Sequence, residues 1–206
     1  MRRHDDDIYL THFAFFLQRC DFSRDFSAST GEIMGIVGRY SLLSNIAIAI
    51  GALDASRKGS IKSFTGTESP RNIAFRRCGI SLKCLDAAIS TTASAFREDV
   101  FWSTFLHGLF ELVAENSGDS FATHMTYGLS RMILLLQPGD QLSKPTKTLI
   151  DVFWLLEANR LIIYGDDISI PSVECPWHSS QDNRRTAMKA IITLMIKTAT
   201  FARRRR

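Results

Sequence analysis

The chain has 206 residues, enough for one ordinary domain, and 45% of them are hydrophobic while 22% are charged. That balance is typical of a globular protein and excludes an intrinsically disordered chain. The formal net charge is +4, but the sequence ends in Arg203, Arg204, Arg205 and Arg206. Without these arginines, 21 basic residues balance 21 acidic residues. The excess positive charge therefore belongs to a tail, and it does not indicate a nucleic-acid-binding body.

The amino terminus and the apolar runs exclude common membrane and export signals. Three aspartates, at positions 5–7, precede the first apolar residues, which argues against a secretory signal. The longest apolar run, from Ile46 to Leu53, is far shorter than the ~20 residues that span a bilayer. We therefore expect an intracellular chain without a membrane span.

The cysteines are spaced for structure rather than for metal or redox chemistry. No pair has the two-residue spacing of a zinc knuckle or a redox dithiol. Two of them lie six residues apart in a helical pattern, which predicts that they face different sides. We interpret all four as reduced structural thiols: Cys20, Cys78, Cys84 and Cys175.

The first helix that periodicity predicts runs from Leu42 to Leu53, with Ser41 as its cap. Its Ala, Leu and Ile residues form a wide apolar side, which is typical of a buried helix. Residues 55–69 are small and polar and contain Gly59 and Gly66, which predicts a loop.

Two further helices follow the loop. Ser69-Pro70 predicts a helix start, because Ser caps helices and Pro suits the first helical position. Residues 90–92 are expected to end this helix. The next begins near Glu98-Asp99, whose carboxylates favour a helix amino end. It has the clearest amphipathic pattern of the chain: Trp102, Phe105, Leu106, Leu109, Phe110 and Val113.

The second half of the chain continues the helical pattern. A helix from about Ser120 to Leu136 is expected to break at residues 137–140, and another runs from Thr146 to Tyr164. Residues 168–182 are expected to form a loop, and Arg184 to Phe201 is a last helical candidate. These elements predict an all-α fold of antiparallel helices. We expect a helical regulatory domain over residues 1–170, followed by a loop and a basic helix or tail over residues 171–206.

Three parts of the sequence, taken in order, resemble one known family. They are the Ala-rich helix from Leu42 to Asp54, the Phe110-Glu111-Leu112 helix end, and the Phe121…His124…Gly128 segment that precedes residues 157–160. This series resembles the fungal-specific transcription factor domain, the helical regulatory region of six-cysteine zinc-cluster transcription factors. The family usually has Trp at the position of Phe121. The zinc cluster itself is absent, and the family domain usually continues further, so the resemblance suggests a shortened form.

The resemblance implies a transcription-regulator-like protein in the nucleus, with the cytoplasm as the alternative. Such proteins often control clustered metabolic genes, including those for secondary metabolites. Regulation would run through protein partners, a homo- or heterodimer, or a small-molecule effector. Without a zinc cluster, direct specific DNA binding is not expected. The alternative function is a binding module that pairs with full-length regulators and modulates them, or else a non-functional fragment.

The Phe121, His124 and Gly128 set is the main candidate site. The three residues share one face of the predicted helix. Either His124 is a packed helix residue beside a glycine that permits a close crossing, or it contacts an effector or partner. We favour packing, since neither a Cys nor a second His stands near enough in the sequence to complete a metal set.

The remaining polar candidates do not form a catalytic pattern. His107 has Glu111 four residues on, and we expect a surface contact there; His12 and His178 are isolated. Asp166-Asp167 follows Gly165 and is expected to be a solvated turn. Gly31, Gly35 and Gly38 are not spaced as a phosphate loop. The sequence thus predicts no enzyme, no metal site and no cofactor.

The carboxyl-terminal arginines have three open interpretations. Arg203 to Arg206 could be a nuclear import signal, a nonspecific phosphate contact or an inert solvated tail. Residues 184–206 as a whole could form a basic amphipathic helix, which also suits a membrane surface or a calmodulin-like partner.

Overall fold

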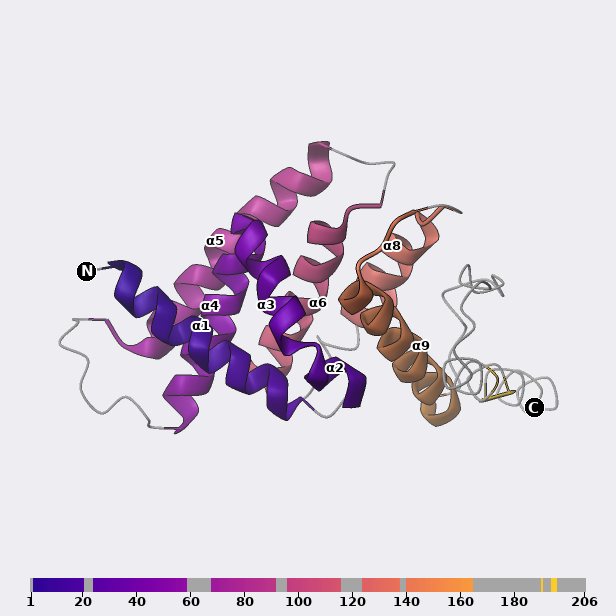
Figure 1. Ribbon diagram of the computed structural model, residues 1–206, viewed down its shortest axis with the longest axis horizontal. Coiled ribbons are helices and arrows are strands. Elements are labelled where there is room, and N and C mark those ends of the chain that lie inside the picture. The colour runs from indigo at the N-terminus through magenta and orange to yellow at the C-terminus, as the bar shows by residue number, and fades with distance from the viewer. Residues whose placement is uncertain are drawn as a thin grey trace.

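The computed structural model describes residues 2–20, 24–58, 68–91, 96–115, 124–137, 140–164, 190 and 194–195. Helices make up most of these residues, and within these ranges no strand occurs. The elements are α1 Arg2–Arg19, α2 Arg24–Ala28, α3 Thr30–Arg39, α4 Ser41–Lys58, α5 Pro70–Thr91, α6 Glu98–Ala114, the π-helix η1 His124–Leu129, α8 Ser130–Leu134 and α9 Lys144–Tyr164 (Figure 1). The predicted all-α fold class is confirmed.

Helix α4 is the centre of the fold. It packs against α1, α3, α5 and α6, and every residue from Ile46 to Ala55 is buried. The expectation of a buried helix from its wide apolar side is therefore confirmed. The helix continues to Lys58, so the loop predicted to begin at residue 55 was wrong by one turn. Basic residues in that last turn complement the negative helix carboxyl end, and this favours the extension.

The predicted starts of α5 and α6 agree with the structure. The backbone N–H of Asn72 donates to Ser69 Oγ at 3.2 Å, which is the expected cap of α5. Helix α5 ends at Thr91, within the Ser-Thr run that was expected to end it, and α6 begins at Glu98. Helix α9 begins at Lys144, two residues before the predicted start.

The structure adds three helices before Leu42, where the sequence analysis predicted none. Among the described side chains of α1, only Tyr9, Phe13 and Leu17 are fully buried, four residues apart, while Phe15 of the same helix is exposed. This narrow stripe on a highly charged helix gives a weak periodic signal. Helix α3 buries Ile33, Ile36 and Val37 and interrupts them with exposed glycines.

One continuous helix was predicted from Ser120 to Leu136, but the structure has a π-helix followed by a short α-helix there. Residues 120–123 lie outside the described part of the chain, and the backbone then forms a π-helix before it becomes the α-helix α8. At the interruption predicted for residues 137–140, the Gln137 N–H donates to Asp140 Oδ2 at 2.8 Å. Residues 165–189 lie outside the described ranges, as does the expected domain boundary at residue 170.

Helix α6 is buried in the core and also contacts elements of the second half of the chain. All its residues from Asp99 to Phe110 are buried, and its Trp102 and Phe105 rings contact Phe26 of α2. A buried polar link then joins α6 to α9. Thr146 Oγ1 accepts from Trp102 Nε1 at 2.8 Å and donates to Glu98 Oε1 at 2.5 Å. This link fixes the start of α9, which runs beside the main bundle (Figure 1).

Candidate functional site

Of the predicted Phe121, His124 and Gly128 site, His124 and Gly128 lie on η1, which packs against α6. Gly128 faces Thr104: a Cβ built on this glycine would lie 2.7 Å from Thr104 Cγ2, closer than real Cβ contacts allow. A side chain at position 128 would therefore require the Thr104 side chain to move. His124 begins η1, but only its backbone is described, and Phe121 lies outside the described residues.

The π-helical backbone distinguishes this segment from the other described helices. Such i→i+5 turns are rare, and they occur mostly as single turns within longer helices, frequently at functional sites. Here the π turn runs directly into α8, so the two form one helical segment with a local irregularity. The periodicity of the sequence gave no signal for it.

His107 was expected at the surface, and this prediction was wrong. Its side chain is only 2% exposed, because the whole of α6 around it is buried. Nδ1 lies 2.7 Å from the Ser103 carbonyl oxygen, one helical turn back, which places a proton on that nitrogen. The imidazole is therefore a hydrogen-bonded core group rather than an exposed acid or base.

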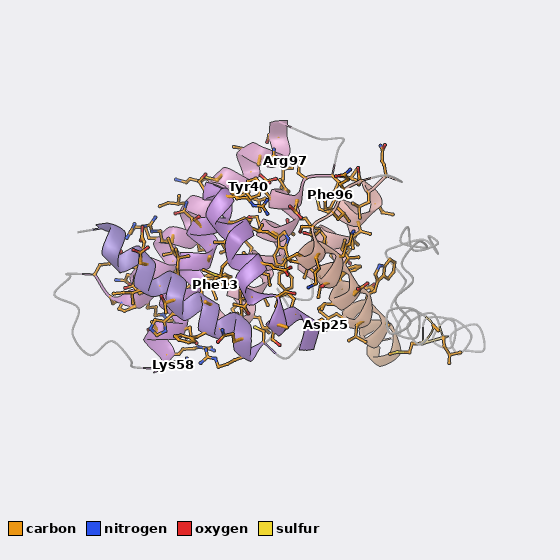
Figure 2. The ribbon with its side chains drawn as sticks, viewed as in Figure 1. Phe13, Asp25, Tyr40, Lys58, Phe96 and Arg97 are labelled. Carbon is orange, nitrogen blue, oxygen red and sulfur yellow. The ribbon has the colours of Figure 1, made fainter. Side chains whose placement is uncertain are left out.

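Around Asp54 three basic side chains meet a single carboxylate at the crossing of α1 and α4. Arg19 Nη2 lies 2.5 Å from Oδ1, while Lys58 Nζ and His12 Nδ1 lie 3.3 and 3.4 Å from Oδ2. Burial by itself would raise the pKa of this carboxyl, but hydrogen bonds from the three basic groups outweigh it and hold the pKa below its ordinary value. Figure 2 labels Lys58 at this end of the bundle. We call these four residues the Asp54 cluster.

The thiols of Cys20 and Cys78 are not activated. Burial raises the pKa of Cys20, next to Arg19 of the Asp54 cluster, to about 12. Burial, together with the negative charge of Glu111, raises the pKa of Cys78 to about 11. Both thiols therefore stay protonated at neutral pH and are poor nucleophiles. Cys78 is buried and Cys84 is exposed, so the prediction that they face different sides of one helix is confirmed.

Several candidates from the sequence cannot be placed. Cys175, His178, Asp166-Asp167 and Arg203 to Arg206 all lie outside the described residues. Within the residues that are described, no three His, Cys, Asp or Glu side chains are grouped so as to hold a metal ion. In the same part of the chain, no helix is long and apolar enough to cross a membrane.

An exposed apolar stripe on α5 was not predicted from the sequence. Phe75, Leu82 and Ile89 are 46%, 47% and 52% exposed, although Cys78 and Leu85 between them are buried. The signal was present as an interval of seven residues, which returns to nearly the same helix face every two turns. Periodicity showed that α5 is apolar, but it could not show which apolar residues the bundle would cover.

Comparison with protein-family models, with curated proteins and with solved structures finds no match to this chain.

Proposed function

We propose that this chain is a transcription-regulator-like protein whose helical domain acts through an effector or a protein partner, in the nucleus, on a group of metabolic genes. The observation that carries the proposal is the η1 segment. It holds the His124…Gly128 part of the family-like series on an irregular π turn, and it packs against α6, the helix that also carries the Phe110-Glu111-Leu112 part. The described parts of the series thus lie on helices that pack against each other.

The chemistry of the described side chains favours binding over catalysis. The buried His107 is hydrogen-bonded, the Cys20 and Cys78 thiols are protonated, and the Asp54 carboxylate is neutralised by basic neighbours. None of these groups has the activated state that acid–base or nucleophilic chemistry needs. A regulatory role needs only a surface whose occupancy changes what the domain binds.

A genetic experiment tests the proposal. Deleting the coding sequence in the source organism and sequencing total RNA should change transcript levels for a set of metabolic genes, and the parent gene should restore them. Unchanged transcripts in the deletion strain would contradict the regulatory role. Because this readout does not involve the folded state in solution, it is independent of every stability measurement described below.

A substitution of His124 distinguishes a packing role from contact with an effector or partner. His124→Gln keeps a hydrogen-bonding group on η1, so it should leave thermal unfolding close to that of the parent if the role of His124 is packing. A variant that unfolds like the parent but no longer restores the transcripts would assign His124 to an effector or partner site. A variant that is normal in both assays would confine the role to packing.

We do not expect this chain to bind DNA sequence-specifically by itself. The body of the chain is charge-neutral once the four terminal arginines are removed, so any DNA binding should be nonspecific and should weaken steeply with salt. A mobility-shift assay with the purified chain and promoter fragments measures this. Sequence-selective shifts that persist at high salt would contradict the expectation and reveal a DNA-reading element.

The alternative function, a binding module that pairs with regulators, is favoured by a different observation. Phe75, Leu82 and Ile89 of α5 are each about half exposed, and of these Phe75 also contacts the Phe110 ring of α6. A module of this kind would require its partner for activity, whereas the leading proposal requires an effector or partner at η1. Variants in α5 and in η1 therefore separate the two functions.

A further inference from the structure

Helix α9 is buried on more than the side that faces the bundle. The bundle side is marked by Thr146, which bonds Trp102 of α6, and by Ile150 and Phe153 at three- and four-residue steps; all three are at most 1% exposed. Among the described elements, α9 packs mainly against α2 and η1, and it lies beside the main bundle (Figure 1). Burial on a second side of this helix therefore calls for a further cover.

Such a second side exists, and it changes from exposed to buried along α9. Lys147, Trp154 and Ala158 share it, because seven and eleven residues make nearly two and three full helical turns. This side lies about a quarter turn away from Thr146. Lys147 is exposed, whereas Trp154 is only 9% exposed and Ala158 is fully buried. The cover thus lies over the carboxyl-terminal half of α9 and leaves its start open.

The contacts of Trp154 indicate that this cover is apolar. Its ring packs edge-on against Phe153, with the ring centres 5.7 Å apart. Its buried Nε1–H meets no hydrogen-bond acceptor in the described part of the chain. A polar loop laid over the indole would offer carbonyl or hydroxyl oxygens to this donor, whereas aliphatic side chains would not. The cover therefore has the character of Met, Ile or Leu side chains.

Met195, near the carboxyl end of the chain, supplies a side chain of this kind. It is partly buried and packs against the main hydrophobic core, which also contains Trp154 and Ala158. Its neighbour Leu194 is 65% exposed, and Ala190 is exposed as well; all three residues are helical. One apolar side chain of this helical segment is thus turned toward the core while the others face away.

The spacing of the surrounding sequence extends this single contact to a whole face. Apolar residues recur at three- and four-residue steps on one side of a helix over residues 184–201: Met188, Ile191, Ile192, Met195 and Ile196. Met195 lies within about 20° of Met188 around the helix axis, whereas Leu194 lies about 120° and Ala190 about 160° away. The exposure of the described residues therefore agrees with this face being the contact face.

We propose that residues 184–201 form an amphipathic helix that closes as a strap over the carboxyl-terminal half of α9, with Met195 on its contact face. The closed strap hides its own apolar face and Trp154 at the same time, so it is an autoinhibitory contact that keeps both surfaces from any other molecule. Met195 is only partly buried, which suits a contact that can open. The strap does not rest on the regulatory function, since it follows from burial along α9 and around Met195.

Matched substitutions at two adjacent positions test the strap through the accessibility of Trp154. Met195→Glu places a charge on the contact face and should open the strap, so acrylamide should quench the tryptophan fluorescence several-fold more strongly than in the parent. Leu194→Glu places the same charge on the exposed neighbour and should leave quenching unchanged. All chains are full-length and carry Trp177→Phe. Since Trp102 is fully buried, Trp154 then dominates the change.

Two controls assign the signal. Adding Trp154→Phe to Met195→Glu should remove the added quenching, and thermal unfolding followed by circular dichroism verifies that every variant is folded. Equal quenching in the Met195 and Leu194 variants, or added quenching that survives the loss of Trp154, would overturn the proposal.

A second pair of substitutions tests whether the whole helical face docks or Met195 alone. Ile192→Glu lies on the same predicted face, one turn before Met195, and should raise the quenching of Trp154 as Met195→Glu does. Ala190→Glu lies on the opposite side and should leave it unchanged. Quenching that responds to position 195 but not to position 192 would reduce the contact to one side chain and overturn the strap.

Dilution distinguishes a strap that closes within one chain from one exchanged with a second copy. A strap closed within its own chain is independent of protein concentration, so the quenching of the parent should stay constant from micromolar to submicromolar solutions. Quenching that rises on dilution, together with a sedimentation coefficient that falls toward the monomer value, would show that the cover comes from another copy and would overturn the proposal.

Discussion

Two close helix crossings in this fold depend on glycine, and they differ in what the glycine contacts. At the crossing of α1 and α4, a Cβ on Gly51 would overlap the carbonyl oxygen of Tyr9 and contact the backbone nitrogen of Phe13. At the crossing of α6 and η1, a Cβ on Gly128 would meet only the Thr104 methyl group, at 2.7 Å. The first glycine faces main chain, and the second faces one side chain.

The difference decides how each crossing tolerates change. Backbone atoms inside a helix cannot move without moving the helix, whereas a side chain can rotate or be replaced. Helix α1 is also held at this crossing by the buried Tyr9 and Phe13 and by the Asp54 cluster. We therefore expect the α1–α4 crossing to be rigid and essential for folding, and the α6–η1 crossing to be adjustable. An adjustable contact suits a segment that responds to an effector.

The largest effect is expected for Gly51→Ala. The new methyl group cannot be accommodated unless α1 moves away from α4, and this movement would expose Tyr9 and Phe13. We expect a loss of about 3 kcal/mol or more in the free energy of unfolding, at the upper end of what overpacking costs. Urea denaturation followed by circular dichroism measures it.

Gly35→Ala is the matched control for that substitution. Gly35 lies in the middle of α3, is exposed, and has no heavy atom within 4 Å of a built Cβ. Alanine there should be neutral or should stabilise the helix by up to ~1 kcal/mol, from its higher helix propensity. If Gly51→Ala behaves like this control, the α1–α4 crossing is not as close as the structure shows.

Gly128→Leu should have the next largest effect. Leucine inserts a full side chain where even a Cβ already meets the Thr104 methyl group, and we expect a cost of about 1–3 kcal/mol. The same urea titration measures it, and the transcript assay reports whether function is lost as well. A variant as stable as the parent would show that η1 can separate from α6 without penalty.

Acidification should loosen the α1–α4 crossing through Asp54. The folded pKa of this carboxyl lies below its ordinary value, so its contribution to stability is fully present above about pH 4 and is lost as the pH falls through the folded pKa. Asp54→Asn removes the charge at every pH and should cost about 1–2 kcal/mol at pH 7. The difference in stability between parent and variant should therefore shrink below about pH 4. A difference that stays constant down to pH 2 would exclude this role for the Asp54 cluster.

The smallest effect is expected for Gly128→Ala, and it should be reversible by a second substitution. The single methyl group meets Thr104 Cγ2, so we expect a cost of about 1 kcal/mol or less. Thr104→Ser removes that methyl group and keeps the hydroxyl that donates to the Val100 carbonyl at 2.9 Å. The double variant should recover most of the loss, which a double-mutant cycle measures as a coupling energy. Strictly additive losses would show that the two residues are not in contact.

Sequence signals were strong wherever a helix is defined by neighbouring residues. The Ser69-Pro70 start of α5, the acidic start and apolar face of α6, and the Ala-rich character of α4 all depend on residues within a few positions of one another. Caps, proline and periodicity act over one or two turns of the chain, so they could be found without knowledge of the fold. The all-α class followed from these signals alone.

Only the tertiary structure decided which faces are covered and which polar groups meet. His12 and Asp54 are 42 residues apart, and Arg77 of α5 pairs with Asp6 of α1 across 71 residues. No local pattern marks such pairs. The burial of His107, the backbone contact of Gly51 and the exposure of Leu82 likewise depend on how separate helices pack. Periodicity thus determined that these segments are helical, while the choice of buried face came from contacts between residues far apart in the chain, which local sequence does not encode.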